Sequence, residues 1–252
     1  MASFRHDDVE IAYLDEGARV AEPIVLVHGF ASSKEINWIH PGWVSALTRA
    51  GRRVIAFDNR GHGQSSKLYD PAAYHSATMA EDARALLDHI EIERADIMGY
   101  SMGARIGAYL ALNHRQRVRS LVLGGLGIHL VDGIGLPESI AEALLAPSLA
   151  DVRDETGRTF RAFAEQTRSD LKALAACIRG SRQTLTREQA STLRVPALIA
   201  VGTKDTVAGS PQALAELMPN ARAVAIPERD HMLAVGDKVF KSAVLEFLSR
   251  AP

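Results

Sequence analysis

Ser101 is the residue whose surroundings in the sequence point most directly to chemistry. Residues 99–103, Gly-Tyr-Ser-Met-Gly, match the pattern G-x-S-x-G, in which the serine occupies a sharp turn between a strand and a helix. Large side chains two positions before or after the serine would collide across such a turn, which accounts for the two glycines. The turn exposes the hydroxyl as a nucleophile. Because the same glycines could instead serve close helix packing, the pattern has to be weighed with its context.

A serine hydroxyl becomes nucleophilic when a histidine takes its proton and a carboxylate orients that histidine. In an open parallel sheet, ligands bind at the carboxyl ends of the strands, so these partners are expected just past a strand. Asp205 follows the apolar run 195–201, and His231 follows the run 221–226. The sequence therefore predicts a catalytic triad of Ser101, Asp205 and His231.

Two other acids are alternatives for the orienting carboxylate. Asp132 follows the predicted strand 119–123 but lies well beyond its end. Asp230 directly precedes His231, and neighbouring side chains in a loop usually diverge. We therefore favour Asp205.

Two backbone N–H groups are expected to stabilise the negative charge that develops when the hydroxyl attacks a carbonyl carbon. One belongs to Met102, directly after the nucleophile. The other is expected in the His-Gly-Phe segment that follows the apolar run 24–27, and Phe30 is our candidate. The residues expected to bind the substrate are His28, Gly29, Trp38, His129, Phe160 and Phe163. Further apolar candidates are Ile134, Leu136 and Leu144.

The loop 58–65, Asp-Asn-Arg-Gly-His-Gly-Gln-Ser, is rich in polar residues and glycine. One interpretation makes His62 a substrate contact. The other makes the loop a self-bonded support for the serine turn and for the Phe30 segment. We favour the structural role.

The elements that carry these residues alternate between strand and helix. Continuous apolar runs, typical of strands buried on both faces, lie at 24–27, 53–57, 96–98, 119–123, 195–201 and 221–226. Helical patterns lie between several of them, for example at 78–90 and 102–113. This alternation predicts an α/β fold, with a mostly parallel sheet covered by helices on both faces.

The strand–helix alternation stops between residues 124 and 194. Short helices are predicted there at 140–145, 160–163 and 171–178, and no strand is evident. We interpret residues 128–190 as a helical lid inserted into a core formed by residues 1–127 and 191–252. Its apolar residues exceed what an exposed helical pair needs, so one face should cover something.

Composition narrows the class of partner. The 252 residues carry a net charge of −1, so neither nucleic acid nor an anionic membrane is an expected partner. The chain contains one cysteine, so no internal disulfide can form, which fits a reducing compartment. We expect a cytoplasmic protein that uses a small-molecule substrate, as a monomer or homodimer. No nucleotide-binding or metal-binding motif is evident, so no cofactor and no metal are expected.

Taken together, these motifs resemble the α/β-hydrolase superfamily. The resemblance rests on residues 28–30, 58–65, 99–103, 202–205 and 230–231. Within the superfamily the chain is similar to small bacterial esterase-like or lactonase-like serine hydrolases with a helical lid. The resemblance implies an eight-stranded, mostly parallel sheet with the lid inserted after the sixth strand. Serine at 101 argues against the haloalkane dehalogenase and epoxide hydrolase relatives, which use aspartate at that position.

The expected activity is hydrolysis of a small, fairly apolar carboxylic ester, lactone or thioester through an acyl-enzyme on Ser101. Two alternatives stay open. One is a signalling protein on the same fold that binds a small ligand with slow or no turnover. The other is a C–C hydrolase or lyase that depends on the same triad.

Overall fold

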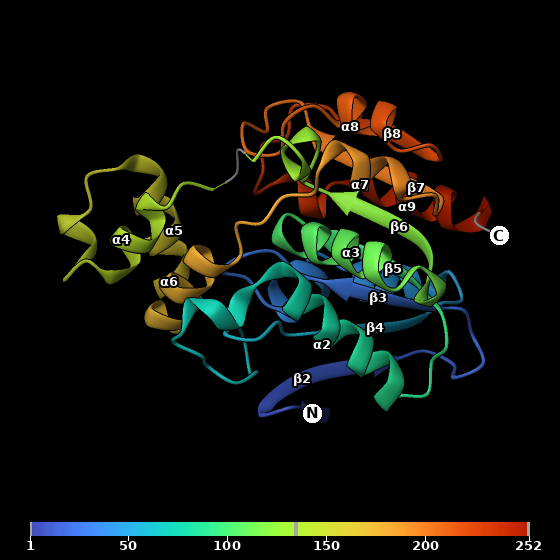
Figure 1. Ribbon diagram of the computed structural model, residues 1–252, viewed down its shortest axis with the longest axis horizontal. Coiled ribbons are helices and arrows are strands. Elements are labelled where there is room, and N and C mark those ends of the chain that lie inside the picture. Colours follow the sequence, from blue (N-terminus) through green and yellow to red (C-terminus); the bar gives the residue numbers. More distant parts are fainter. Residues whose placement is uncertain (1, 134–135, 251–252) are drawn as a thin grey trace.

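The computed structural model describes residues 2–133 and 136–250, which form one eight-stranded sheet with helices on both faces (Figure 1). The strand order is β1-β2-β4-β3-β5-β6-β7-β8; β2 pairs antiparallel with both β1 and β4, and the strands from β4 to β8 in this order run parallel. The strands are β1 (Ala2–His6), β2 (Val9–Glu16), β3 (Pro23–Val27), β4 (Arg53–Phe57), β5 (Ala95–Tyr100), β6 (Val118–Gly124), β7 (Ala197–Gly202) and β8 (Ala221–Ile226). The predicted α/β class and the mostly parallel eight-stranded sheet are confirmed.

The continuous apolar runs arise because the central strands are covered on both faces. In β3, Val25 and Val27 pack into the core on one face, whereas Ile24 and Leu26 pack into the core on the other. All four side chains are fully buried. A strand with only one buried face would show polar residues at alternate positions, as edge strand β1 does.

Five helices cover the two faces of the sheet. On one face lie α2 (Ser76–His89), α3 (Met102–Asn113) and α8 (Pro211–Leu217), which contribute Met79, Ile106 and Leu214 to the core. On the other face lie α1 (Trp43–Arg49) and α9 (Lys238–Arg250), which contribute Trp43 and Phe240. Short helical segments connect these elements at Glu35–Ile39, Pro71–Tyr74, Arg115–Arg117, Ile128–Leu130, Leu149–Asp151 and Ala234–Gly236.

A helical segment interrupts the alternation between β6 and β7. It contains α4 (Ser139–Leu145), α5 (Glu155–Gln166), α6 (Leu171–Gly180) and α7 (Arg187–Thr192). Figure 1 shows α4, α5 and α6 as a group beyond the end of the sheet toward which the β6 arrow points, while α7 lies next to β7. We call α4, α5 and α6 the three-helix group. Its position places it beside the carboxyl ends of the parallel strands, where Ser101 lies.

Within the described residues, no helix combines the length and the apolar character that crossing a bilayer requires.

Candidate active site

Ser101 lies on a backbone turn between β5 and α3 that only small neighbours permit. Its φ of 53° and ψ of −114° are unfavourable for a residue with a side chain. A Cβ atom on Gly99 would lie 2.1 Å from the carbonyl oxygen of Gly103, and one on Gly103 would lie 2.0 Å from the carbonyl oxygen of Val27. Both glycines are therefore required by close backbone contacts. The turn has the strand-to-helix geometry that the sequence pattern predicts for a nucleophile elbow.

Ser101, His231 and Asp205 form a continuous hydrogen-bonded chain. The Nε2 atom of His231 lies 2.9 Å from the Oγ of Ser101, and its Nδ1 lies 2.8 Å from the Oδ2 of Asp205. The Asp205 side chain is fully buried, and its Oδ1 accepts hydrogen bonds from the N–H groups of Val207 and Ala208. The structure brings together the three residues that were predicted from separate strand ends.

The environment of Asp205 keeps its carboxylate charged. Burial alone would raise the pKa of Asp205, but the hydrogen bond and charge of His231, with the N–H groups of Val207 and Ala208, lower it on balance. A charged, immobile carboxylate holds the proton on Nδ1 of His231, which leaves Nε2 free to accept the proton of Ser101.

The two competing acids have other partners. Asp132 is partly exposed and lies 3.2 Å from a guanidinium nitrogen of Arg187. Asp230 accepts hydrogen bonds from the N–H groups of Met232 and Leu233, which shape the turn after His231. Neither acid bonds to the imidazole of His231.

Tyr100 is a residue of the site that the sequence analysis missed. Its hydroxyl donates a 2.6 Å hydrogen bond to the carbonyl oxygen of His231. Burial raises the pKa of the Tyr100 phenol well above its usual range, so the hydroxyl keeps the proton that it donates. The only signal in the sequence is its place directly before the nucleophile, where the pattern accepts any residue.

The backbone N–H groups of Phe30 and Met102 are free to act as donors. In the described part of the chain, neither has a hydrogen-bond acceptor. Phe30, Met102 and Ser101 all line the same cavity. Both candidate N–H donors therefore belong to residues that border the space in front of the nucleophile.

The prediction that His28 binds the substrate is wrong, because His28 lines neither cavity and instead bonds to the backbone beside Phe30. It is fully buried, its Nδ1 donates to the carbonyl oxygen of Gly29 at 2.8 Å, and its Nε2 accepts the N–H of Asn59 at 3.0 Å. Burial lowers the pKa of His28, in keeping with a neutral ring that both donates and accepts. With both nitrogens occupied, His28 has no donor or acceptor left for a substrate.

The loop 58–65 has the structural role that we favoured. Asp58 accepts hydrogen bonds from the N–H groups of Lys34 and Gln64, and its Oδ2 lies 2.7 Å from the Nζ of Lys34. His62 is buried, bonds to the carbonyl oxygen of Arg60, and lies edge-on to the ring of Phe30 at 6.0 Å. Burial lowers the pKa of His62 to about 3, so this ring stays neutral.

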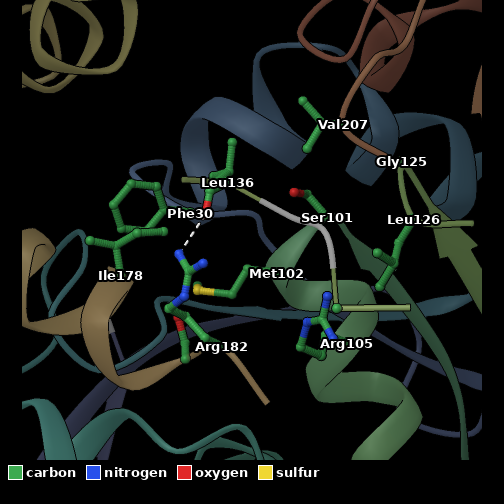
Figure 2. A pocket seen from close by; sticks show the side chains of 12 residues that line it. Phe30, Ser101, Met102, Arg105, Gly125, Leu126, Leu136, Ile178, Arg182 and Val207 are labelled. Atoms are coloured by element: carbon green, nitrogen blue, oxygen red, sulfur yellow. Dashed lines mark hydrogen bonds between the residues drawn. The ribbon is translucent and has the colours of Figure 1, made fainter. Parts of the chain in front are cut away.

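Two cavities meet at Ser101. The first is bordered by Phe30, Met102, Leu126, Leu136, Ile178 and Val207, with Arg105 and Arg182 (Figure 2). The second lies between His231 and the three-helix group, and its lining includes Gly29, Phe160 and Phe163, which were predicted as substrate contacts. Leu136 borders both cavities, whereas Ile134 lies outside the described residues.

Three expected substrate-binding residues do not border either cavity: His28, Trp38 and His129. Trp38 is fully buried in the core, where it packs edge-on against Trp43 at 6.3 Å. The Nδ1 of His129 donates to the carbonyl oxygen of Val207 at 2.7 Å, which holds this ring against the loop after Asp205. Both side chains are used for packing.

Arg105 and Arg182 are cavity residues that the sequence analysis did not assign to the site. A signal for Arg105 was present, since it is the one charged residue in an otherwise apolar buried helix. Arg182 follows α6 in a segment without a clear pattern. Among the described residues, no group of three or more His, Cys, Asp or Glu side chains is arranged to hold a metal ion.

Comparison with known proteins identifies the family. The sequence model of the family described as alpha/beta hydrolase fold matches residues 22–168, which is more than half of the chain. The chain belongs to the α/β-hydrolase family. The match includes Ser101 and ends before Asp205 and His231, so the predicted roles of these two residues rest on their geometry alone.

A curated relative matches most of this α/β-hydrolase. The chain is 33% identical over 242 residues to the dihydrolipoyllysine-residue acetyltransferase component of acetoin cleaving system of Pseudomonas putida. That alignment covers 88% of this chain and 62% of the relative, so this chain spans less than two thirds of the relative's length.

Solved structures match the α/β-hydrolase over nearly its whole length. A hydrolase from Pseudomonas aeruginosa PA01 is 29% identical, with a TM-score of 0.81 and coverage of 98% of this chain and 97% of that one. The enol-lactonase from Burkholderia xenovorans LB400 is 25% identical, with a TM-score of 0.76 and coverage of 99% and 100%.

The ion pair of Lys34 and Asp58 generates a stability prediction. Both side chains are almost completely buried. Lys34→Met leaves Asp58 without a cationic partner among the described residues, and Asp58→Asn leaves Lys34 only the partly exposed Glu35. Each single substitution is expected to lower the free energy of unfolding by about 3–5 kcal/mol, and the double variant by less than the sum. Urea denaturation measures both. Lys204→Met, which breaks the exposed pair with Glu228, is the control and should cost less than about 1 kcal/mol. Equal losses for buried and exposed pairs would contradict the prediction.

Proposed function

We propose that this α/β-hydrolase is a serine hydrolase that cleaves a small carboxylic ester, lactone or thioester through an acyl-enzyme on Ser101. One observation carries the proposal: the chain of hydrogen bonds from Asp205 through His231 to Ser101, which ends at the cavities. The serine has a base within 2.9 Å, and the base has a buried carboxylate behind it.

The reaction begins when the Oγ of Ser101 attacks the carbonyl carbon and its proton passes to Nε2 of His231. The N–H groups of Phe30 and Met102 stabilise the oxyanion of the tetrahedral intermediate. The intermediate then collapses: the bond to the leaving group breaks, and that group takes the proton from Nε2. Asp205 stabilises the imidazolium while it exists.

Water completes the cycle. It loses a proton to Nε2 of His231 as its oxygen attacks the acyl carbon of the ester formed with Ser101. A second tetrahedral intermediate forms, and the same N–H groups stabilise its oxyanion. When it collapses, the bond to the Oγ of Ser101 breaks, Oγ regains a proton from Nε2, and the carboxylic acid leaves.

The cavity walls support a small substrate with an apolar portion. Phe30, Leu136 and Ile178 border the first cavity, and Phe160 and Phe163 from α5 border the second. The bond type is proposed from the triad, and the name enol-lactonase of one solved relative agrees with cleavage of an ester bond.

Replacing the nucleophile tests the central claim. Ser101→Ala removes the attacking oxygen, so kcat/KM for a short-chain 4-nitrophenyl ester is expected to fall by at least about a thousandfold. A fluorophosphonate probe should label the parental protein at Ser101 and leave the variant unlabelled. Parental activity in Ser101→Ala would exclude this nucleophile. A folded parental protein that neither turns over an ester panel nor reacts with the probe would favour a ligand-binding role.

The choice of acid is tested by matched substitutions. Asp205→Asn removes the charge that orients and stabilises His231, and kcat is expected to fall by about 10³- to 10⁴-fold. Asp230→Asn and Asp132→Asn are the controls, because neither acid touches the imidazole. Steady-state kinetics on the same ester measures all three. A larger loss in either control than in Asp205→Asn would reassign the acid.

The mechanism also predicts a pH dependence. His231 accepts a proton only when its imidazole is neutral, so kcat/KM is expected to fall as the pH is lowered from about 8 to about 5. Asp205 remains charged over this range, because its pKa is lowered on balance: bonds from His231 and two N–H groups outweigh its burial. The pH profile of kcat/KM measures the effect, with circular dichroism as the control for folding. A rate that stays flat down to about pH 4 would exclude His231 as the base.

A further inference from the structure

Four arginines are buried among the described residues, and Arg105 differs from the other three. Each of the others has a carboxylate oxygen 2.7 Å from its guanidinium: Arg53 with Asp15, Arg60 with Asp82 and Arg161 with Glu165. This pairing is expected, because a buried charge is costly unless an opposite charge compensates it. Arg105 has no carboxylate within 4.0 Å in the described part of the chain.

Arg105 instead donates to neutral carbonyl oxygens. Its Nη1 lies 2.7 Å from the oxygen of Gln183 and 3.4 Å from that of Leu130, and its Nη2 lies 3.0 Å from that of His129. These bonds hold the side chain in place but supply no negative charge. Burial lowers the pKa of Arg105 to about 10, which still leaves the guanidinium charged at neutral pH.

The unused donors of Arg105 are of the kind that bind carboxylates elsewhere in this protein. Arg53 and Arg60 hold Asp15 and Asp82 through the pair Nε and Nη2. In Arg105, Nε has no partner among the described residues, and Nη2 donates only to His129. The Nε–H and one of the two N–H bonds of Nη2 therefore have no acceptor among the described residues, and a guanidinium uses such a pair to hold a planar anion.

A second guanidinium reaches the same cavity from the segment after α6. Arg182 is exposed, its Nη1 donates to the carbonyl oxygen of Leu136 at 2.7 Å, and it too has no carboxylate partner among the described residues. Figure 2 shows both guanidinium groups below Ser101 in that view, with Arg105 coming from α3 and Arg182 from the opposite wall. No aspartate or glutamate is among the described residues that line this cavity.

We propose that Arg105 and Arg182 form a carboxylate-binding subsite beside the nucleophile, so that the natural substrate is a small ester, lactone or thioester bearing a carboxylate. The type of bond that is cleaved in this substrate rests on the proposed function of Ser101. The carboxylate supplies the counter-charge that Arg105 lacks, and the apolar residues between the arginines and Ser101 contact the connecting carbons. Electrostatic attraction also favours entry of an anion into a cavity with two positive charges and no negative one.

Two pairs of matched esters test the subsite. One pair is 4-nitrophenyl hydrogen adipate and 4-nitrophenyl hexanoate, which differ by a carboxylate in the acyl part. The other is 4-acetoxybenzoate and phenyl acetate, which differ by a carboxylate in the alcohol part. In at least one pair, kcat/KM for the charged ester should be about ten times that for the neutral ester.

The variants separate the subsite from the general charge of the surface. Arg182→Gln and Arg105→Gln are each expected to lower that ratio by about tenfold, and Arg105→Lys, which keeps the charge, by less. Arg179→Gln is the matched control on α6, because Arg179 is exposed and borders neither cavity. Intrinsic differences between the esters cancel when the ratio is compared between variants. Arg182 is exposed, so its variant tests the subsite even if Arg105→Gln fails to fold.

The outcomes distinguish the subsite from the proposed hydrolase activity. If the protein hydrolyses neutral esters through Ser101 and the ratio is the same in all variants, the subsite is wrong and the hydrolase assignment stands. Binding of adipate to Ser101→Ala, measured by calorimetry, gives a result that needs no turnover. Affinity that falls about tenfold on adding Arg182→Gln supports the subsite. No binding, or binding that Arg182→Gln leaves unchanged, overturns it.

Discussion

The site depends on one steric constraint, the contact between the start of α3 and the end of β3. Gly103 approaches the carbonyl oxygen of Val27 so closely that a methyl group would not fit. This contact fixes where Ser101 stands relative to the sheet. The same carbonyl precedes the segment that carries Phe30, so one backbone contact sets both the nucleophile and the N–H group proposed to face its oxyanion. Two elements distant in sequence are thus aligned without any side chain between them.

The polar groups around this contact divide into two kinds. In the first kind, burial lowers the pKa values of His28 and His62, which bond to backbone carbonyl groups, and Lys34 supplies a counter-charge for Asp58. This region neither gains nor loses charge near neutral pH and acts as a rigid support. The second kind is represented by Arg105, which is buried without a counter-charge among the described residues. Stability alone does not explain such a residue, which is why it points to a ligand.

The fold and the triad could be predicted from the sequence because their causes are local. Apolar runs of strand length reveal a sheet covered on both faces, glycines reveal the tight turn, and residues just past strands meet at one edge. The errors concern orientation. Trp38 lies in the helical turn Glu35–Ile39, and packing against Trp43 turns it into the core. His28 and His129 lie beside the site, but carbonyl and N–H groups from other segments occupy their rings. Phe160 and Phe163 lie three residues apart on α5, so they share one face of the helix, and both line the second cavity.

The hydrogen bond from Tyr100 to the carbonyl oxygen of His231 has a mechanical consequence. It ties the loop that carries the base to the residue directly before the nucleophile. The distance between His231 and Ser101 is therefore set within the sheet side of the molecule and does not depend on where α4, α5 and α6 stand. The three-helix group instead borders the cavities, through Phe160 and Phe163 of α5 and Ile178 of α6. The walls of the cavities and the proton path are therefore built from different elements of the chain.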